Sequence, residues 1–147
     1  MPCRLPLFAL LLLAASSCSR TPVPLDFDDL RSRFIHDSLA LSPVAATAAG
    51  YHLHNNRLLD LELDDLSAKG LDLQRRHWRD WQKQLARINP QSLDPQDQAD
   101  LSLMNNQAGS ALLELDEIRS WQHNPTLYVE LLGHALFTPY AVQYAPE

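Results

Sequence analysis

Two long stretches of the chain carry apolar residues at helical spacing, and the spacing is the same in both. In the first, steps of 3, 4, 3, 4 and 3 residues connect Leu71, Gln74, Trp78, Trp81, Leu85 and Ile88. In the second, the same steps connect Leu101, Met104, Ala108, Ala111, Leu115 and Ile118. This period places each set on one face of a helix. Ser67 and Asp94 are suitable N-caps. The short proline-containing link between the stretches predicts an antiparallel helical hairpin, in which Ala108 and Ala111 leave room for a tryptophan.

Two further helices are predicted before the hairpin. Asp26 is a typical N-cap, and the apolar positions that follow it predict a helix over residues 27–41. Ser42 and Pro43 suit the start of a second, short helix of small residues, and Gly50 suits its end. Small side chains of this kind allow close packing against a neighbouring element.

The remaining segments are predicted to be a loop and a terminal helix. Residues 54–67, "HNNRLLDLELDDLS", have no regular period and are rich in asparagine and aspartate, which favours a loop. A last helix is expected over residues 126–137, with Pro139 ending it. Because no segment shows the alternation typical of a strand, the predicted fold class is all-α, a helical bundle built around the long hairpin.

The beginning of the chain has the layout of a bacterial signal peptide. Arg4 precedes an apolar run over residues 5–15, and small residues follow. The run is too short to cross a bilayer, because a spanning helix needs about 20 apolar residues. We therefore expect a leader that directs export.

The residues "ASSC" at positions 15–18 resemble a lipobox, in which small residues precede a cysteine that receives lipid. This resemblance predicts a signal peptide over residues 1–17, an acylated Cys18, a tether over residues 18–25 and a helical region over residues 26–147. The alternative is ordinary secretory cleavage without lipid. Ser19 follows the cysteine where an aspartate would favour retention at the inner membrane. The expected location is thus the outer membrane, facing the periplasm, with the bilayer as a partner through Cys18.

Charge and cysteine content exclude several classes of function. The formal net charge is -6, and removal of residues 1–17 takes away one positive charge to leave -7. An acidic chain has no electrostatic reason to bind nucleic acid or anionic head groups. The two cysteines are Cys3, which leaves with the leader, and Cys18, which would carry lipid. No thiol then remains for a disulfide or a metal site.

A search for local catalytic motifs finds none in this sequence. The HExxH helix, the G-x-S-x-G elbow, the phosphate loop and the C-x-x-C pair are all absent. His52 and His54 can share a metal outside a helix, but no third ligand has an evident spacing, so a solvated loop pair is favoured. Glu130 and His134 lie four residues apart on one helical face. They are interpreted as an intrahelical polar pair, with metal binding or acid–base chemistry as the alternative.

Two other clusters have a structural interpretation beside a functional one. Trp78 and Trp81 can stack on a sugar or a peptide, but their helical spacing with Leu85 favours a place in the core. Four carboxylates form an acidic stretch: Asp60, Glu62, Asp64 and Asp65. It lacks the glycine and the spacing of a calcium-binding EF-hand, so a solvated loop is favoured. The sequence thus predicts no catalytic residue and no metal ligand.

Several short motifs, in order, resemble the N-terminal region of a bacterial family. They are "SPVAATAAGYH" at 42–52, "DLS" at 65–67, "LDP" at 93–95, and "WQHNP" at 121–125 followed by Tyr128. Their order and spacing are similar to those of the family called domain of unknown function 885, whose members resemble all-helical zinc metallopeptidases of the gluzincin type. The resemblance covers nearly the whole mature chain. It implies export and an all-helical fold.

What the resemblance implies about catalysis lies outside this sequence. In that family a His-Glu-x-x-x-Gly-His-His-like segment far downstream supplies the zinc ligands and the general base, and the members are several times longer. This chain is expected to be their first part and to stop at Glu147 before that segment, so zinc and a peptide substrate are implied only for full-length relatives. Two hypotheses result: the N-terminal helical segment of an exported lipoprotein, walling a substrate cleft, or a stand-alone, non-catalytic helical lipoprotein that binds a partner.

Overall fold

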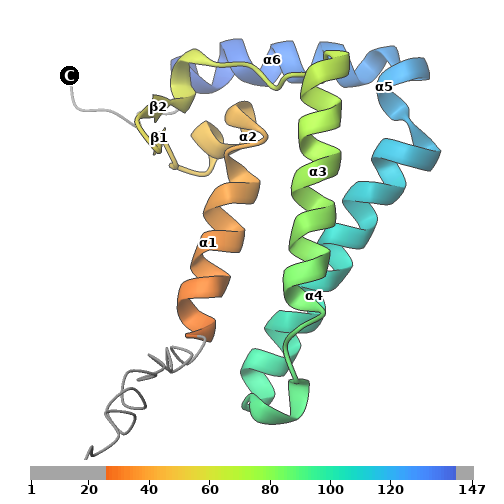
Figure 1. Ribbon diagram of the computed structural model, residues 1–147. Coiled ribbons are helices and arrows are strands. Elements are labelled where there is room, and N and C mark those ends of the chain that lie inside the picture. Colours follow the sequence, from red (N-terminus) through yellow and green to blue (C-terminus); the bar gives the residue numbers. More distant parts are fainter. Residues whose placement is uncertain (1–25, 142–147) are drawn as a thin grey trace, which may run out of the picture.

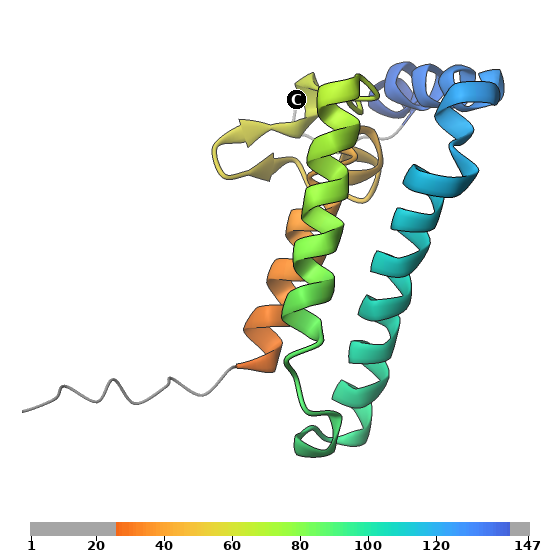
Figure 2. The same ribbon diagram turned by 45° about the vertical axis from the view of Figure 1, so that its right-hand side comes forward.

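The computed structural model describes residues 26–141, which form an all-α fold and confirm the predicted class (Figure 1). The helices are α1 (Phe27–Leu39), α2 (Pro43–Ala48), α3 (Ala68–Leu85), α4 (Pro95–Leu113), α5 (Ser120–His123) and α6 (Pro125–Ala141). Helices α1, α3 and α4 run side by side, and α6 lies across one end of them (Figures 1 and 2). The chain enters this bundle at the opposite end, where α1 begins. Helix α6 is thus far from the start of α1.

The predicted helical hairpin is formed by α3 and α4. Ser67 Oγ accepts a hydrogen bond from the Gly70 N–H at 3.2 Å, and Asp94 Oδ1 accepts one from the Asp97 N–H at 2.9 Å. Both predicted caps are therefore confirmed, and each satisfies a backbone donor that a helix start leaves unpaired. A short 3-10 helix, η2 (Pro90–Ser92), lies in the link between the two helices.

The main core lies where α1 meets this hairpin. Its buried members are Phe27, Leu30, Phe34, Leu71, Trp78, Trp81, Leu85, Leu101, Met104, Ala108 and Leu115. Phe34 packs its ring edge-on against Trp81, with 5.2 Å between the ring centroids. The interpretation of the tryptophan pair as core is confirmed. Arg31 joins α1 to α4 from the side, donating to Asp97 at 2.9 Å and to Asp100 at 2.7 Å.

The second apolar stripe ends earlier than its sequence period indicates. After Leu113 the chain forms a π-helical turn, η3 (Glu114–Ile118), and Arg119 then has a φ of 55°. A π turn contains an extra residue, so positions beyond it rotate away from the stripe. As a result Leu115 is buried, while Ile118 is 48% exposed. The prediction that Ile118 continues the core face was wrong.

Two arginines of α3 hold this π turn against the hairpin. Arg75 Nε donates to Asp116 Oδ1 at 2.7 Å, and Arg79 Nη2 donates to Asp116 Oδ2 at 2.9 Å. Arg75 also donates to the Leu115 carbonyl oxygen at 3.1 Å. The hydrogen bond from Arg75 is the main cause that lowers the pKa of the Asp116 carboxyl. The ionised carboxylate is therefore the form that the fold favours.

The segment predicted to be a loop contains regular structure. Strands β1 (Leu53–His54) and β2 (Arg57–Leu58) pair antiparallel, and the 3-10 helix η1 (Leu59–Leu61) follows. Asn55 and Asn56 both have positive φ, 47° and 63°, as a two-residue type I′ hairpin turn requires. Leu59 is fully buried with Ala40 and Ala46 in a second small core. The hairpin is thus tied to α1 and α2.

Helix α6 extends further than predicted. It runs from Pro125 to Ala141, and Pro139 lies inside it. The expectation that Pro139 ends the helix was wrong. A proline inside a helix lacks the N–H donor and crowds the carbonyl of residue i−4, so α6 continues past Pro139 with one backbone hydrogen bond missing. At the other end, the Asn124 side chain accepts a hydrogen bond from the Thr126 N–H at 3.1 Å.

Two glycines in helices provide a matched test of packing. A Cβ atom on Gly70 would lie 2.3 Å from the backbone oxygen of Asp65, whereas one on Gly109 would meet no atom within 4 Å. We expect Gly70→Ala to destabilise the fold by about 1–3 kcal/mol through overpacking. Gly109→Ala, as the control, should stabilise it by roughly 0.5–1 kcal/mol because alanine is the better helix former. Urea unfolding followed by circular dichroism measures both, and two changes of the same sign would contradict the prediction.

A candidate groove between helices α2 and α6

A groove of about 590 Å³ lies between α2 and α6. It is lined by Val44, Ala45, Ala48 and Ala49 of α2, by Leu127, Glu130, Leu131 and His134 of α6, and by Asp64 and Leu66 of the connecting segment. Seven of these ten residues are apolar. A largely apolar lining with a few polar groups, at a volume of about 300–1,000 Å³, is typical of small-ligand sites. We call this hollow the α2–α6 groove.

The wall formed by α2 consists of small residues. Val44 and Ala46 are buried, whereas Ala45, Ala48 and Ala49 are exposed on the outward side of the helix. Helix α6 covers this side only in part. One side of α6 is half-buried, at positions that recur every three or four residues: Leu127, Leu131, Ala135 and Thr138. The alanines are too short to fill the space between the two helices, and this leaves the groove open.

Asp64 positions α2 and also lines the groove. Its Oδ1 accepts a hydrogen bond from the Val44 N–H at 3.1 Å, in the first turn of α2. Ser42 occupies the N-cap position as predicted, but its side chain makes no capping bond. The cap therefore comes from a residue 20 positions later in the sequence. Burial raises the pKa of the Asp64 carboxyl, although the bond from Val44 acts to lower it.

Glu130 and His134 line the groove together, but they do not form the predicted pair. Among residues 26–141, no hydrogen bond or ion pair joins the Glu130 carboxylate to the His134 imidazole. Both side chains are on exposed positions of α6. In the part of the chain that the structure describes, they and Asp64 are the three titratable side chains that line the groove, and no lysine or arginine lines it.

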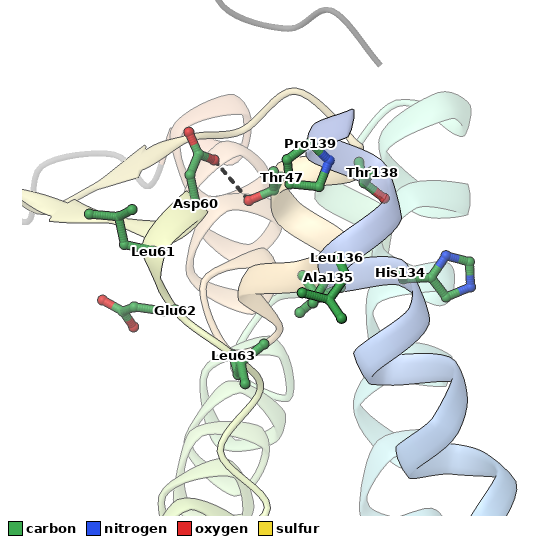
Figure 3. Close-up of a pocket in the computed structure, with 11 residues that line it drawn as sticks. Thr47, Asp60, Leu61, Glu62, Leu63, His134, Ala135, Leu136, Thr138 and Pro139 are labelled. Carbon is green, nitrogen blue, oxygen red and sulfur yellow. Dashed lines mark hydrogen bonds between the residues drawn. The ribbon is translucent and has the colours of Figure 1, made fainter. Parts of the chain in front are cut away.

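A smaller hollow of about 170 Å³ adjoins the groove and shares Val44 and His134 with it (Figure 3). In it the Thr47 hydroxyl donates to Asp60 Oδ1 at 2.8 Å. The same carboxylate oxygen lies 2.8 Å from His52 Nδ1. The imidazole of His134 points away from Thr47 and Asp60 (Figure 3). Asp60 thus links α2 to the β-hairpin segment, and His134 takes no part in that link.

The histidines at positions 52 and 54 and the acidic stretch were expected to be solvated, but the structure gives them partners within the protein. His54 Nδ1 lies 2.8 Å from the Tyr51 hydroxyl, and both His52 and His54 are only partly exposed. In the acidic stretch, each carboxylate has a partner: Asp60 has Thr47, Glu62 has Arg57, Asp64 has Val44, and Asp65 has Ser67. The polar groups of this segment therefore hold the hairpin and α2 in place.

His77 of α3 is a histidine whose pKa is shifted by its surroundings. His77 packs edge-on against Trp78, with 5.0 Å between the ring centroids, and its Nε2 lies 3.4 Å from Ser38 Oγ. Burial lowers the pKa of His77, so the fold favours the neutral imidazole. Its contacts are those of a side chain at the edge of the core.

The structure does not place a metal centre in the part of the chain that it describes. Between residues 26 and 141, no set of three histidine, cysteine, aspartate or glutamate side chains is arranged to hold a metal ion. Over the same range, none of the helices has the length and apolar character needed to cross a membrane. Cys18 and the predicted leader lie outside the described residues.

The groove was not predicted from the sequence. Helical spacing identified Glu130 and His134, but Asp64 was expected in a solvated loop and the alanines of α2 were expected to pack closely against a neighbour. The feature of the sequence that could have predicted the groove is the outward face of α2. Its apolar side consists only of alanine, and alanine side chains are too short to fill a contact with a neighbouring helix. Nothing in the local pattern indicated that α6 returns to this face.

Comparisons of the chain with protein-family models, with curated proteins and with solved structures give no match. The fold and the groove are therefore described from this chain alone. The resemblance to the family called domain of unknown function 885 stays a prediction.

Proposed function

We propose that this chain is the N-terminal helical segment of an exported lipoprotein that resembles zinc metallopeptidases, and that it carries no catalytic residue itself. Its role is to form part of the wall of a cleft completed by other parts of the protein. Lipid on Cys18 anchors it at the outer membrane, facing the periplasm. Zinc and the peptide-cleaving residues belong to other parts of such a protein.

The observation that carries this proposal is the surface of α6. The helix is mostly apolar, with Thr126, Glu130, His134 and Thr138 as polar exceptions, yet no residue of it is buried. Its exposed side includes Val129, Leu132, Leu136, Phe137 and Tyr140. Contiguous apolar surface of this kind marks an interaction site. Further protein packed over α6 would supply that cover.

The sequence of α6 favours protein over membrane as this cover. The described chain begins at the far end of α1, which has 13 residues and is thus about 20 Å long at the usual rise of 1.5 Å per residue. Residue 26 is therefore at the opposite end of the bundle from α6. In addition, α6 has no lysine or arginine, which interfacial membrane helices use to contact anionic lipids.

A stand-alone helical lipoprotein that binds a separate partner is the second candidate, because the same α6 surface serves a partner equally well. An antibody against residues 68–113, applied to an extract of the source cells, distinguishes the two. A band well above the size of 147 residues supports the first candidate, and a band at or just below that size supports the second.

Labelling with a palmitate analogue tests the anchoring step. Expressed in a Gram-negative host, the wild-type chain should take up the label, because acylation follows cleavage before Cys18. Cys18→Ser should abolish labelling, since it removes the sulfur that the lipid needs. Cys3→Ser is the matched control and should label normally, because Cys3 leaves with the leader. Equal labelling of wild type and Cys18→Ser, or loss of label in Cys3→Ser alone, would contradict the proposal.

A further inference from the structure

We propose that the α2–α6 groove binds a small ligand that has an extended apolar body and a cationic nitrogen. This inference rests on the groove alone and depends neither on acylation of Cys18 nor on the family resemblance. The apolar lining defines the body of the ligand, and the charges at the groove define its head group.

The apolar part of the site comes from both helices. Ala45, Ala48 and Ala49 offer a shallow wall of methyl groups on α2, and Leu127 and Leu131 face it from α6. The three alanines are exposed, so this apolar surface is wet in the absence of a ligand. An alkyl or aryl group that replaces the water gains the usual free energy of apolar burial. A narrow space between two helices favours an elongated shape.

The charge of the site favours a cation. Asp64 and Glu130 are acidic, His134 is the third polar residue, and no lysine or arginine of residues 26–141 lines the groove. Glu130 has no hydrogen bond or ion pair within the described range, so its carboxylate is available to a ligand. A positive nitrogen placed beside a carboxylate at an apolar surface is attracted more strongly than in water, because the local dielectric constant is lower.

Asp64 supports the same conclusion independently. Its carboxylate is partly buried and accepts a bond from the Val44 N–H, but no cationic side chain among residues 26–141 pairs with it. Burial raises the pKa of this carboxyl by more than its hydrogen bonds with Val44 and Ser42 lower it, so these neutral donors do not fully offset the cost of burying its charge. A cationic ligand would supply the missing compensation. The overall negative charge of the chain also favours the approach of cations.

Three probes with the same octyl chain test the proposal on purified residues 19–147, which lack the predicted leader and Cys18. Octylammonium, octanol and octanoate share the same apolar body and differ in head-group charge. Isothermal titration calorimetry at low salt should show the tightest binding for octylammonium. Octanol should bind about tenfold more weakly or worse, because the charge-assisted hydrogen bond is lost. Octanoate should not bind measurably. Added salt should weaken the binding of octylammonium, since exposed charges are screened.

Two pairs of variants locate the site. Ala48→Phe fills the groove and should abolish binding of octylammonium, whereas Ala99→Phe, on an exposed position of α4, should leave it unchanged. Glu130→Gln should weaken binding about tenfold by removing one charge. Glu117→Gln, on an exposed position of the π turn, is its control. Because Glu130 and Glu117 are exposed, both variants should fold as the wild type does, and circular dichroism checks this.

The outcomes that would overturn the proposal are also defined. Octanoate or octanol binding as tightly as octylammonium would exclude a cationic site. Equal loss in Ala48→Phe and Ala99→Phe, or no effect of Glu130→Gln, would place the binding elsewhere. Octylammonium binding that disappears as the protein concentration rises would show that a second copy of the chain occupies the groove, which would also refute a small-ligand site.

Discussion

Trp81→Ala should destabilise the fold strongly, by about 3–5 kcal/mol. Trp81 is 4% exposed and packs edge-on against Phe34 of α1 at 5.2 Å between the ring centroids. Its removal takes away one of the two tryptophans at the contact of α1 with the α3–α4 hairpin and leaves a cavity there. Domains of this size have stabilities of about 5–15 kcal/mol, so the variant should be marginally folded.

Urea unfolding monitored by circular dichroism at 222 nm measures this effect. Leu73→Ala is the matched control, because Leu73 lies on the same helix but is an exposed position, and its change should stay within about 0.5 kcal/mol. The pair Phe34→Ala and Trp81→Ala, combined in a double-mutant cycle, should show a coupling energy of about 0.5–1.5 kcal/mol from the aromatic contact. A loss below about 1 kcal/mol for Trp81→Ala would mean that the tryptophan is not in a packed core.

The second large effect concerns association through α6. Purified residues 19–147, which lack the predicted leader and Cys18, should self-associate in solution, because the outward side of α6 exposes a continuous apolar surface. Leu136→Glu places a charge in that surface. Leu136 is 78% exposed in the single chain, so the substitution should not disturb the fold. If the leucine is buried in the associated form, its loss should raise the dissociation constant by about 10- to 100-fold, which corresponds to roughly 1.5–3 kcal/mol.

Sedimentation velocity over a range of protein concentrations gives this dissociation constant. Leu103→Glu is the control, because Leu103 is 66% exposed but belongs to α4 and not to the surface of α6. It should leave association unchanged. A wild-type chain that remains monomeric across the range, or an equal effect of the two variants, would show that α6 is not the associating surface.

Local patterns in the sequence determined the helices, because their causes are local. A helix needs hydrogen bonds four residues apart, an apolar face with a period near 3.6 and a cap, and all three can be found within one segment. The caps at Ser67 and Asp94 and, up to Leu115, the stripes of α3 and α4 therefore appear in the structure as predicted. The same reasoning placed Trp78 and Trp81 in the core.

Errors of the local prediction occurred where backbone geometry departs from the regular helix. The stripe of α4 was extended to Ile118, although the π turn over 114–118 rotates that residue outward. Pro139 was expected to end α6, yet the helix continues to Ala141. A period counted along the sequence assumes uniform turns, so it cannot include an inserted residue or a tolerated missing hydrogen bond.

Only the tertiary structure decided how the segments between the helices are used. The cap of α2 comes from Asp64, and the hairpin at 53–58 is linked to α2 through Asp60 and Thr47. The groove likewise forms because α6, which begins more than 75 residues after α2 ends, returns to the alanine face of α2. Such contacts depend on where the chain places distant groups in space. Helical period and capping describe interactions between near neighbours, and they carry no information about which distant partner satisfies a given carboxylate or covers a given face.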